Sequence, residues 1–187
     1  MDLKFRERCE LQGHEALDWS DWIIAMAPTT RSPGTQNINF KKRRGTGQEG
    51  YRNKDLANEL AQARVGCCGI YEWCAVKYVS DQDGRSYASH SVVYVGCTCR
   101  RRRGRFGPRA FQAMQERIVA YTKGGNHKKD LINDALRIGW ELWVRFKPAE
   151  NVDAAKSMEN NLLRTYNYPW NVRNNGVRPI LERADLW

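Results

Sequence analysis

The stretch GIYEWCAVKYV, residues 69–79, decides the fold of this chain. It is rich in aromatic and β-favouring residues, so it predicts a strand. The turn sequence DQDG follows at 81–84, and the apolar stretch SVVYVG at 91–96 predicts a second strand. We therefore expect these strands to pair as an antiparallel hairpin whose loop is longer than a minimal turn.

The segments that follow the hairpin predict a third strand and several helices. Residues 140–146 alternate in character, which is typical of a strand. Apolar side chains at helical spacing predict helices at residues 55–64, 108–123, 128–137 and 151–166. The expected fold is α/β in the mixed α+β sense, with a small central antiparallel three-stranded sheet flanked by helices.

The first third of the chain is compositionally mixed. Pro28 and the sequence SPG at 32–34 interrupt its short apolar stretch, which predicts a mobile loop near residues 30–50. We expect two parts in the chain: an N-terminal extension packed on the core at 1–65, and the main domain at 66–187.

The chain is strongly basic. Among its 187 residues, 31 Lys and Arg face 21 Asp and Glu, which gives a formal net charge of +10. This balance favours a nucleic-acid partner, although a basic protein without that role has the same composition. There is no apolar run of about 18 residues, so we expect no membrane-spanning helix.

The six cysteines are expected to stay reduced, because residues 1–4 do not begin a secretory signal. The cysteines at 67–68 and 97–99 lack the two CxxC knuckles of a structural zinc site. Core thiols are therefore favoured over bound zinc.

Five side chains suggest phosphodiester chemistry, which needs an activated water and groups that neutralise developing negative charge. Glu159 lies toward the inward face of its predicted helix, where an unpaired carboxylate is rare. Arg117 and Tyr121 are four residues apart on one helix, so their side chains share a face. Tyr71 and Tyr94 lie in adjacent predicted strands. Each position alone also fits an edge Glu, an exposed Arg or a core Tyr.

The order of these residues resembles the GIY-YIG nuclease superfamily over about residues 66–178. The matching positions are Gly69-Ile70-Tyr71, Tyr94-Val95-Gly96, Arg117, Tyr121, Glu159 and, twelve residues after Glu159, Asn171.

The resemblance implies a catalytic role for each of these side chains. Tyr71 is the candidate general base or the phenol that positions the attacking water, and Tyr94 supports it and the scissile phosphate. Arg117 neutralises the phosphate, and Tyr121 takes the place of a helical His or Tyr. Glu159 holds a single Mg²⁺ or Mn²⁺ ion. The late amide, Asn171, braces the site.

The spacing departs from the family at one point. Arg117 comes 23 residues after Tyr94, because the segment 97–109 is inserted between them. Cys97 stands where some members carry a Lys. Rival candidates for the catalytic arginine are Arg103, Arg105 and Arg109.

A narrower resemblance is to the plant effector-of-transcription family. It rests on residues 17–22, 47–52, 69–72, 130–145 and 166–176. Such proteins are nuclear regulators with a GIY-YIG-like domain that binds and nicks DNA. The resemblance implies a nuclear location and a role in transcription regulation.

Two basic runs are candidate phosphate-contacting surfaces. The run RRRRGR at 100–105 and the run KKRR at 41–44 each fit phosphate contact, a nuclear-localisation signal or a solvated loop. The DNA-binding candidates are Arg100, Arg101, Arg102, Arg103, Arg105, Lys128 and Lys129.

Together these features predict a metal-dependent DNA endonuclease that nicks DNA at one GIY-YIG active site per chain. A homodimer is one way in which such a protein would cut both strands. The alternative is a DNA-binding transcriptional regulator that keeps the fold with weak or no cleavage. A third, weaker alternative is a nuclease for RNA or branched DNA.

Overall fold

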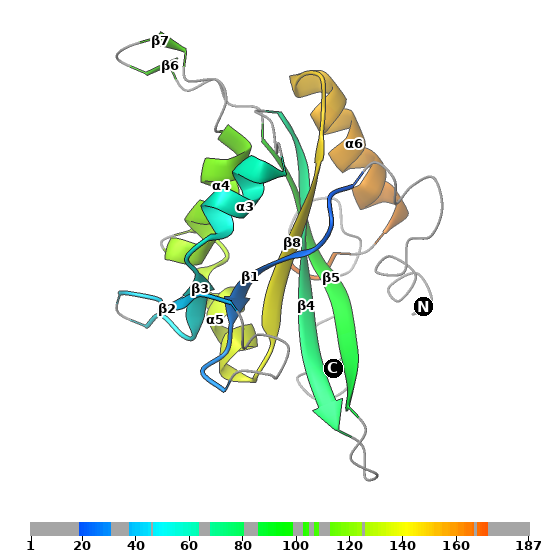
Figure 1. The fold of residues 1–187 in the computed structure, drawn as a ribbon. Coiled ribbons are helices and arrows are strands. Elements are labelled where there is room, and N and C mark those ends of the chain that lie inside the picture. The colour runs from blue at the N-terminus through cyan, green and yellow to red at the C-terminus, as the bar shows by residue number, and fades with distance from the viewer. Residues whose placement is uncertain are drawn as a thin grey trace.

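An antiparallel sheet of six strands forms the centre of the protein in a computed structural model (Figure 1). The structure describes residues 19–30, 38–45, 47–63, 68–80, 86–98, 103–104, 107–108, 113–124, 126–166 and 168–171. The strands of this sheet are β1 (Ile23–Ala27), β2 (Phe40–Lys42), β3 (Tyr51–Asn53), β4 (Gly69–Ser80), β5 (Ser86–Thr98) and β8 (Glu141–Pro148). Their order across the sheet is β2-β3-β1-β8-β4-β5, so β5 is an edge strand.

The hairpin expected from the sequence is confirmed. Strands β4 and β5 pair antiparallel, with Tyr71 opposite Gly96 and Trp73 opposite Tyr94. The third expected strand is β8, which pairs with the other side of β4 and places Phe146 opposite Tyr71. The mixed α+β class is therefore correct.

The predicted sheet of three strands is too small. The N-terminal segment adds β1, β2 and β3, with β1 paired to β8, β3 to β1 and β2 to β3. Part of the loop expected near 30–50 is thus a strand, Phe40–Lys42. Such short strands depend on partners that are distant in sequence, so local composition does not reveal them. The division of the chain at residue 65 stays a prediction.

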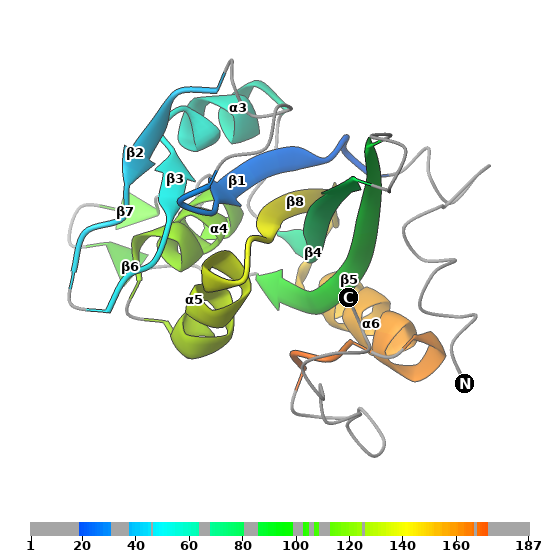
Figure 2. The ribbon, with the colours of Figure 1, turned by 90° about the horizontal axis from the view of Figure 1, so that it is seen from below.

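The helices cover the two faces of the sheet unequally (Figures 1 and 2). On one face lie α3 (Leu56–Gln62), α4 (Ala113–Lys123) and α5 (Lys129–Arg137), and on the other lies α6 (Val152–Thr165). The main core lies under the first three helices, and a smaller apolar cluster lies on the α6 face.

A bulge in β5 sets which side chains reach the main core. Trp73 pairs with Tyr94 but Cys74 pairs with Val92, so Val93 is the extra residue. Val93 and Tyr94 therefore both join the main core, although strand residues normally alternate between faces. The freed carbonyl of Val93 accepts a hydrogen bond from the backbone N–H of Trp170 at 2.8 Å.

A buried ion pair holds the chain after α6 against the sheet. Arg145 donates from Nε and Nη2 to Oε2 of Glu72 at 2.8 and 2.6 Å. Tyr168 donates its hydroxyl hydrogen to Oε1 of Glu72 at 2.5 Å. The Arg145 guanidinium lies 4.5 Å from the ring centroid of Trp19 and 4.6 Å from that of Trp22. A fully buried carboxylate is thereby paired, which its burial requires.

The inserted segment after β5 contains two short paired strands, β6 (Arg103–Gly104) and β7 (Gly107–Pro108). Arg100, Arg101, Arg102, Arg105 and Arg109 lie outside the described residues, and of Arg103 only the backbone is described. In the described part of the chain, no helix has the length and apolar character that crossing a membrane requires.

Candidate active site

Three tyrosines from two strands and a helix meet through their hydroxyl groups. Tyr121 of α4 donates to the Tyr94 hydroxyl at 3.2 Å, and its oxygen lies 3.3 Å from that of Tyr71. The ring centroids of Tyr71 and Tyr94 lie 6.2 Å apart at a tilt of 48°. The i,i+4 spacing on α4 and the pairing of β4 with β5 together produce this cluster.

Arg117 lies beside the phenols, one helical turn before Tyr121. Its guanidinium carbon is 5.4 Å from the Tyr121 ring centroid, and it lies near enough to the Tyr71 hydroxyl to act on the pKa of that phenol. Tyr71 and Tyr121 are 1% and 2% exposed, whereas Arg117 is exposed. The arginine therefore presents positive charge to solvent at the mouth of a buried phenol cluster.

Glu159 approaches the same region from the opposite face of the sheet. It lies on α6, is half-buried, and its Oε1 accepts the backbone N–H of Cys97 at 3.1 Å. Because β5 is an edge strand, groups from both faces can meet around that edge. Arg117 acts to lower the pKa of Tyr94 and Glu159 acts to raise it, so both charges lie near this phenol.

Asn171 holds the edge strand in place. Its Oδ1 accepts the N–H of Val95 at 3.0 Å, and its Nδ2 donates to the carbonyl of Val95 at 2.8 Å. The amide therefore acts on the backbone next to Tyr94. The bracing role that the resemblance implies for Asn171 stays a prediction.

A model of the GIY-YIG domain, described as "GIY-YIG domain-containing protein", matches residues 19–182. The chain belongs to the GIY-YIG domain family. A search of curated proteins and a search of solved structures each found no match. The expected superfamily and fold are thereby confirmed, while the narrower likeness to plant effector-of-transcription proteins stays a prediction. Membership supports a nuclease-type hydrolase function with DNA as the substrate.

Gly96, the glycine in the second half of the GIY-YIG motif, leaves room for Tyr71, the tyrosine in the first half. A Cβ at Gly96 would lie 2.7 Å from the Tyr71 hydroxyl oxygen and 3.1 Å from Cε1 of Tyr94. A carbon that close to a buried ring forces the ring to move. Any side chain at position 96 would therefore displace the hydroxyl cluster.

We expect Gly96→Ala to destabilise the protein by roughly 1–3 kcal/mol, the usual cost of overpacking, and to reduce cleavage. Thermal unfolding followed by circular dichroism measures the first effect. Tyr71→Phe removes the atom nearest to the new methyl group. The loss of stability in the double variant should therefore be smaller than the sum of the losses in the two single variants. Strictly additive losses would contradict the contact between position 96 and Tyr71.

The phenols are poorly suited to ionise. Burial, and then the neighbouring phenols, raise the pKa of Tyr71 well above its ordinary value, although Arg117 acts to lower it. Burial likewise raises the pKa of Tyr94, and Glu159 adds to this while Arg117 opposes it. Burial acts to lower the pKa of Arg117, but the hydrogen bond with Tyr71 and the nearby phenols raise it overall. At neutral pH Tyr71 and Tyr94 are therefore neutral and Arg117 is charged.

His127 joins the cluster, although no sequence pattern predicts its place there. It is exposed in the turn between α4 and α5, with its ring centroid 5.9 Å from that of Tyr121 and 6.3 Å from that of Tyr94. Partial burial, and then Lys128 and Arg117, lower the pKa of His127 below its ordinary value. A neutral imidazole can accept a proton.

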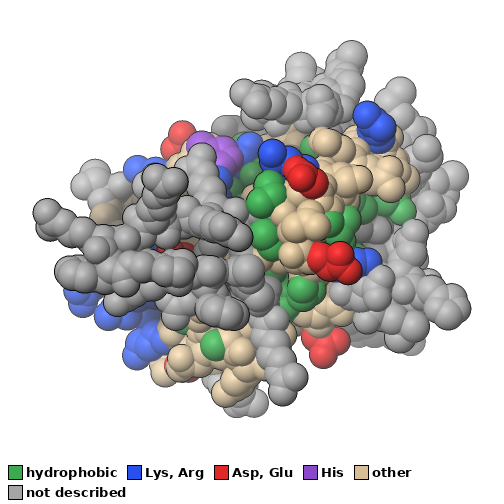
Figure 3. All heavy atoms as spheres, turned by 90° about the horizontal axis from the view of Figure 1, so that it is seen from above, with side chains coloured by type: hydrophobic (Ala, Val, Ile, Leu, Met, Phe, Trp, Pro, Cys, Tyr) green, Lys and Arg blue, Asp and Glu red, His purple; other side chains and the backbone are tan. Residues whose placement is uncertain are grey.

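Of the DNA-binding candidates, Lys128 and Lys129 have described side chains. Lys128 is 4% exposed, its Nζ donates to the carbonyl of Trp170, and it lies 5.1 Å from the Tyr94 ring centroid. The buried Lys128 therefore supports the site by packing against the Tyr94 ring. A direct contact between Lys128 and DNA stays a prediction. Lys129 is half-buried at the start of α5. At the upper end of the molecule, Lys and Arg side chains border acidic and histidine side chains on the described surface (Figure 3).

The donor groups of this GIY-YIG site fit a hard divalent cation. Within the described ranges, no group of three or more His, Cys, Asp or Glu side chains could hold a metal ion. A single half-buried carboxylate, Glu159, uses one oxygen for the Cys97 N–H, which leaves the other for a cation. Mg²⁺ is commonly bound through one or two carboxylates and several waters. GIY-YIG nucleases generally use divalent metal ions.

Proposed function

We propose that this GIY-YIG protein is a metal-dependent DNA endonuclease that nicks one strand. The observation that carries the proposal is the linked set of three tyrosine hydroxyls, with Arg117 beside the Tyr121 ring and Glu159 across the edge of β5. A cluster of buried phenols joined to an arginine and a carboxylate can bind a phosphodiester and stabilise the charge that develops on it. Relaxation of a supercoiled plasmid in Mg²⁺ or Mn²⁺ tests the activity directly.

Arg117 is proposed to bind the scissile phosphate. Its guanidinium is exposed and charged and lies against the Tyr121 ring, so little reorganisation is needed when substrate arrives. A planar guanidinium can donate two hydrogen bonds to one phosphate, which is its preferred geometry. Arg117 would thereby offset the negative charge on the non-bridging oxygens during attack.

Tyr71 is proposed to position the attacking water as a neutral phenol. Its raised pKa opposes the alternative role, in which a phenolate acts as general base. The hydrogen bonds among the tyrosines fix the direction of its hydroxyl. His127, neutral at pH 7 and next to Tyr94 and Tyr121, is the group best suited to take the proton of the water.

A cation on Glu159 would lower the pKa of a bound water and offset charge on the phosphate. Glu159 itself supplies the negative charge that binds such an ion, and the Cys97 N–H fixes the orientation of its carboxylate. Asn171 keeps the strand that carries Cys97 and Tyr94 in register with the helix. One such site per chain cuts one strand at a time, and no observation supports a homodimer.

We expect Tyr71→Phe to lower cleavage by at least about 10²-fold, because it removes the hydroxyl that orients the water. The loss should be similar at every pH between about 6 and 9, since the phenol stays protonated throughout that range. Single-turnover cleavage rates across this pH range measure the loss. DNA binding by the variant should be unchanged. Tyr78→Phe, on the same strand but in contact with the α6-side cluster, is the matched control. Near-normal cleavage by a folded Tyr71→Phe would identify Tyr71 as a core residue.

The second candidate function is a DNA-binding transcriptional regulator with weak or no cleavage. The near-complete burial of Tyr71 and Tyr121 favours it, because such tyrosines also occur in ordinary cores. A wild-type protein that binds DNA but never relaxes a plasmid in either metal would support this function. A nuclear location is part of both proposals and rests on the basic runs; imaging of the tagged protein would test it.

A further inference from the structure

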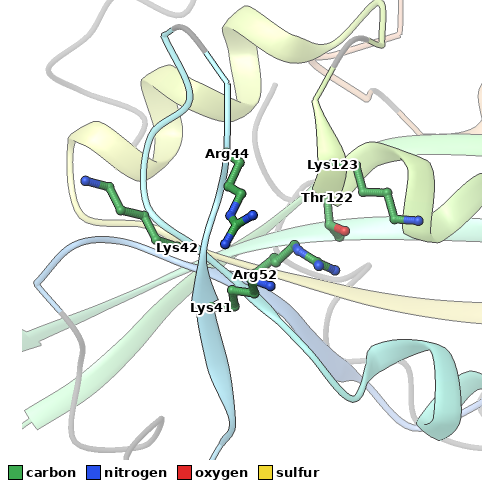
Figure 4. A pocket seen from close by; sticks show the side chains of 6 residues that line it. All are labelled: Lys41, Lys42, Arg44, Arg52, Thr122 and Lys123. Carbon is green, nitrogen blue, oxygen red and sulfur yellow. The ribbon is translucent and has the colours of Figure 1, made fainter.

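A strongly basic hollow lies outside the phenol cluster, between the N-terminal strands and the end of α4. It has a volume of about 240 Å³ and is lined by Lys41, Lys42, Arg44, Arg52, Thr122 and Lys123. Figure 4 shows Arg44 and Arg52 beside Thr122 and Lys123, while Lys42 extends to the other side of β2. Five of its six lining residues are basic, and the lining has no acidic residue.

Within the described ranges, the cations of this basic hollow have no ion-pair partner. Like charges gathered around one concave space repel one another, and the repulsion is relieved when an anion enters. Lys42, Arg44 and Lys123 are exposed, and Lys41 and Arg52 are half-buried, so the charge is accessible.

Arg43, between the lining residues, makes the hollow a fixed part of the fold. It is 2% exposed, and its Nε donates to the carbonyl of Thr122 at 3.2 Å. Its Nη1 donates to the carbonyl of Glu49 at 2.9 Å and to Oδ1 of Asn133 at 2.8 Å. Burial lowers the pKa of Arg43 to about 10, so it remains charged at neutral pH and adds to the local positive potential. The basic run at 41–44 is thus anchored to α4 and α5.

The hollow and the candidate active site share helix α4. Arg117 and Lys123 are six residues apart on it, which is about 9 Å along the helix axis. Successive nucleotides in one strand of duplex DNA are spaced by about 3.4 Å along its axis. A strand whose scissile phosphate lies at Arg117 therefore has phosphates within reach of the hollow only a few nucleotides away.

We propose that the basic hollow binds backbone phosphates of the DNA substrate beside the cleavage site. The proposal rests on the nuclease function proposed above, and it assigns substrate binding to the N-terminal strands β2 and β3. Phosphate contacts of this kind position a duplex without reading its sequence. They act on parts of the substrate that do not react, so they should contribute to affinity more than to turnover.

The test measures binding of a fluorescein-labelled duplex by anisotropy, without divalent metal so that no cleavage occurs. Arg44→Ala with Arg52→Ala should weaken binding by about tenfold per lost phosphate contact at 0.1 M salt and reduce the salt slope by about two. The Lys123 side chain lies on α4, so Lys123→Ala leaves the strands intact. This variant should reduce the salt slope by about one. Lys156→Ala, an exposed lysine on α6, is the control and should match wild type.

Cleavage by the same variants separates this proposal from the nuclease proposal. With Mg²⁺ or Mn²⁺, the hollow variants should raise KM and leave kcat within about twofold. The proposal would be overturned if both Arg44→Ala/Arg52→Ala and Lys123→Ala bound DNA with wild-type affinity and salt slope. It would also be overturned if these variants lost the binding of inorganic phosphate without losing the binding of DNA. If wild type binds DNA through the hollow yet never cleaves it, the nuclease proposal fails, and what remains of this one is the binding of DNA phosphates by the hollow.

Discussion

Glu159→Gln is expected to abolish detectable nicking while DNA binding is retained or becomes tighter. The amide oxygen can still accept the Cys97 N–H that Oε1 of Glu159 accepts at 3.1 Å, so α6 and β5 should stay together. Among the described residues of the candidate site, Glu159 is the carboxylate placed to hold a divalent cation, and the substitution removes its negative charge. Metal ions supply several kcal/mol of charge stabilisation to such reactions, which corresponds to a loss of at least about 10²-fold in rate. Tighter binding would follow from removing a carboxylate that faces the phosphates.

Plasmid nicking and duplex anisotropy, measured on the same preparations, check this result. Glu150→Gln is the matched control, because Glu150 is an exposed carboxylate just before α6. Thermal unfolding of Glu159→Gln should match wild type, whereas Glu159→Ala also loses the acceptor for Cys97. Equal nicking by Glu159→Gln and wild type at low Mg²⁺ would remove Glu159 from the metal site.

Arg117→Ala is expected to lower kcat by about 10²-fold or more with only a small change in DNA affinity. An arginine that meets charge as it develops acts on the transition state more than on the bound substrate. Its guanidinium contacts Tyr71 and Tyr121, so its loss also removes a constraint on the phenols. Arg117→Lys should recover part of the rate, because an ammonium keeps the charge but loses the planar pair of donors.

Single-turnover rates and dissociation constants for each variant check this prediction. Arg164→Ala, an exposed arginine on α6, serves as the control and should behave as wild type. A reversed phenotype, with affinity lost and the rate unchanged, would move the catalytic arginine into the inserted segment. Arg103, Arg105 and Arg109 would then be tested in the same way.

Much of the candidate site is predictable because its members have local signals. The strand hairpin places Tyr71 and Tyr94 near each other, and the i,i+4 spacing adds Arg117 to Tyr121 on one face. Glu159 is signalled by a carboxylate on the inward face of a helix. The exposed turn residue His127 has no such signal, because its contacts come from the way α4 and α5 pack.

The basic residues show where local sequence stops being informative. The run at 41–44 is uniform in charge, yet Arg43 is buried while its three neighbours line the basic hollow. Lys128 has the composition of a surface residue but lies under Tyr94 and Trp170. A charged side chain is buried only where distant segments supply acceptors, and a sequence window does not contain those segments.

The sequence by itself determined the mixed class, the central hairpin with β8, the order of the motif residues and the excess of positive charge, because each depends on periodicity, spacing or composition. Only the tertiary structure decided the three added strands, the bulge at Val93, the need for glycine at position 96 and the raised pKa of Tyr71. These features depend on which segments pack together in space. Strand pairing, atomic contact and desolvation are properties of the packed chain, so they are settled only when distant segments meet.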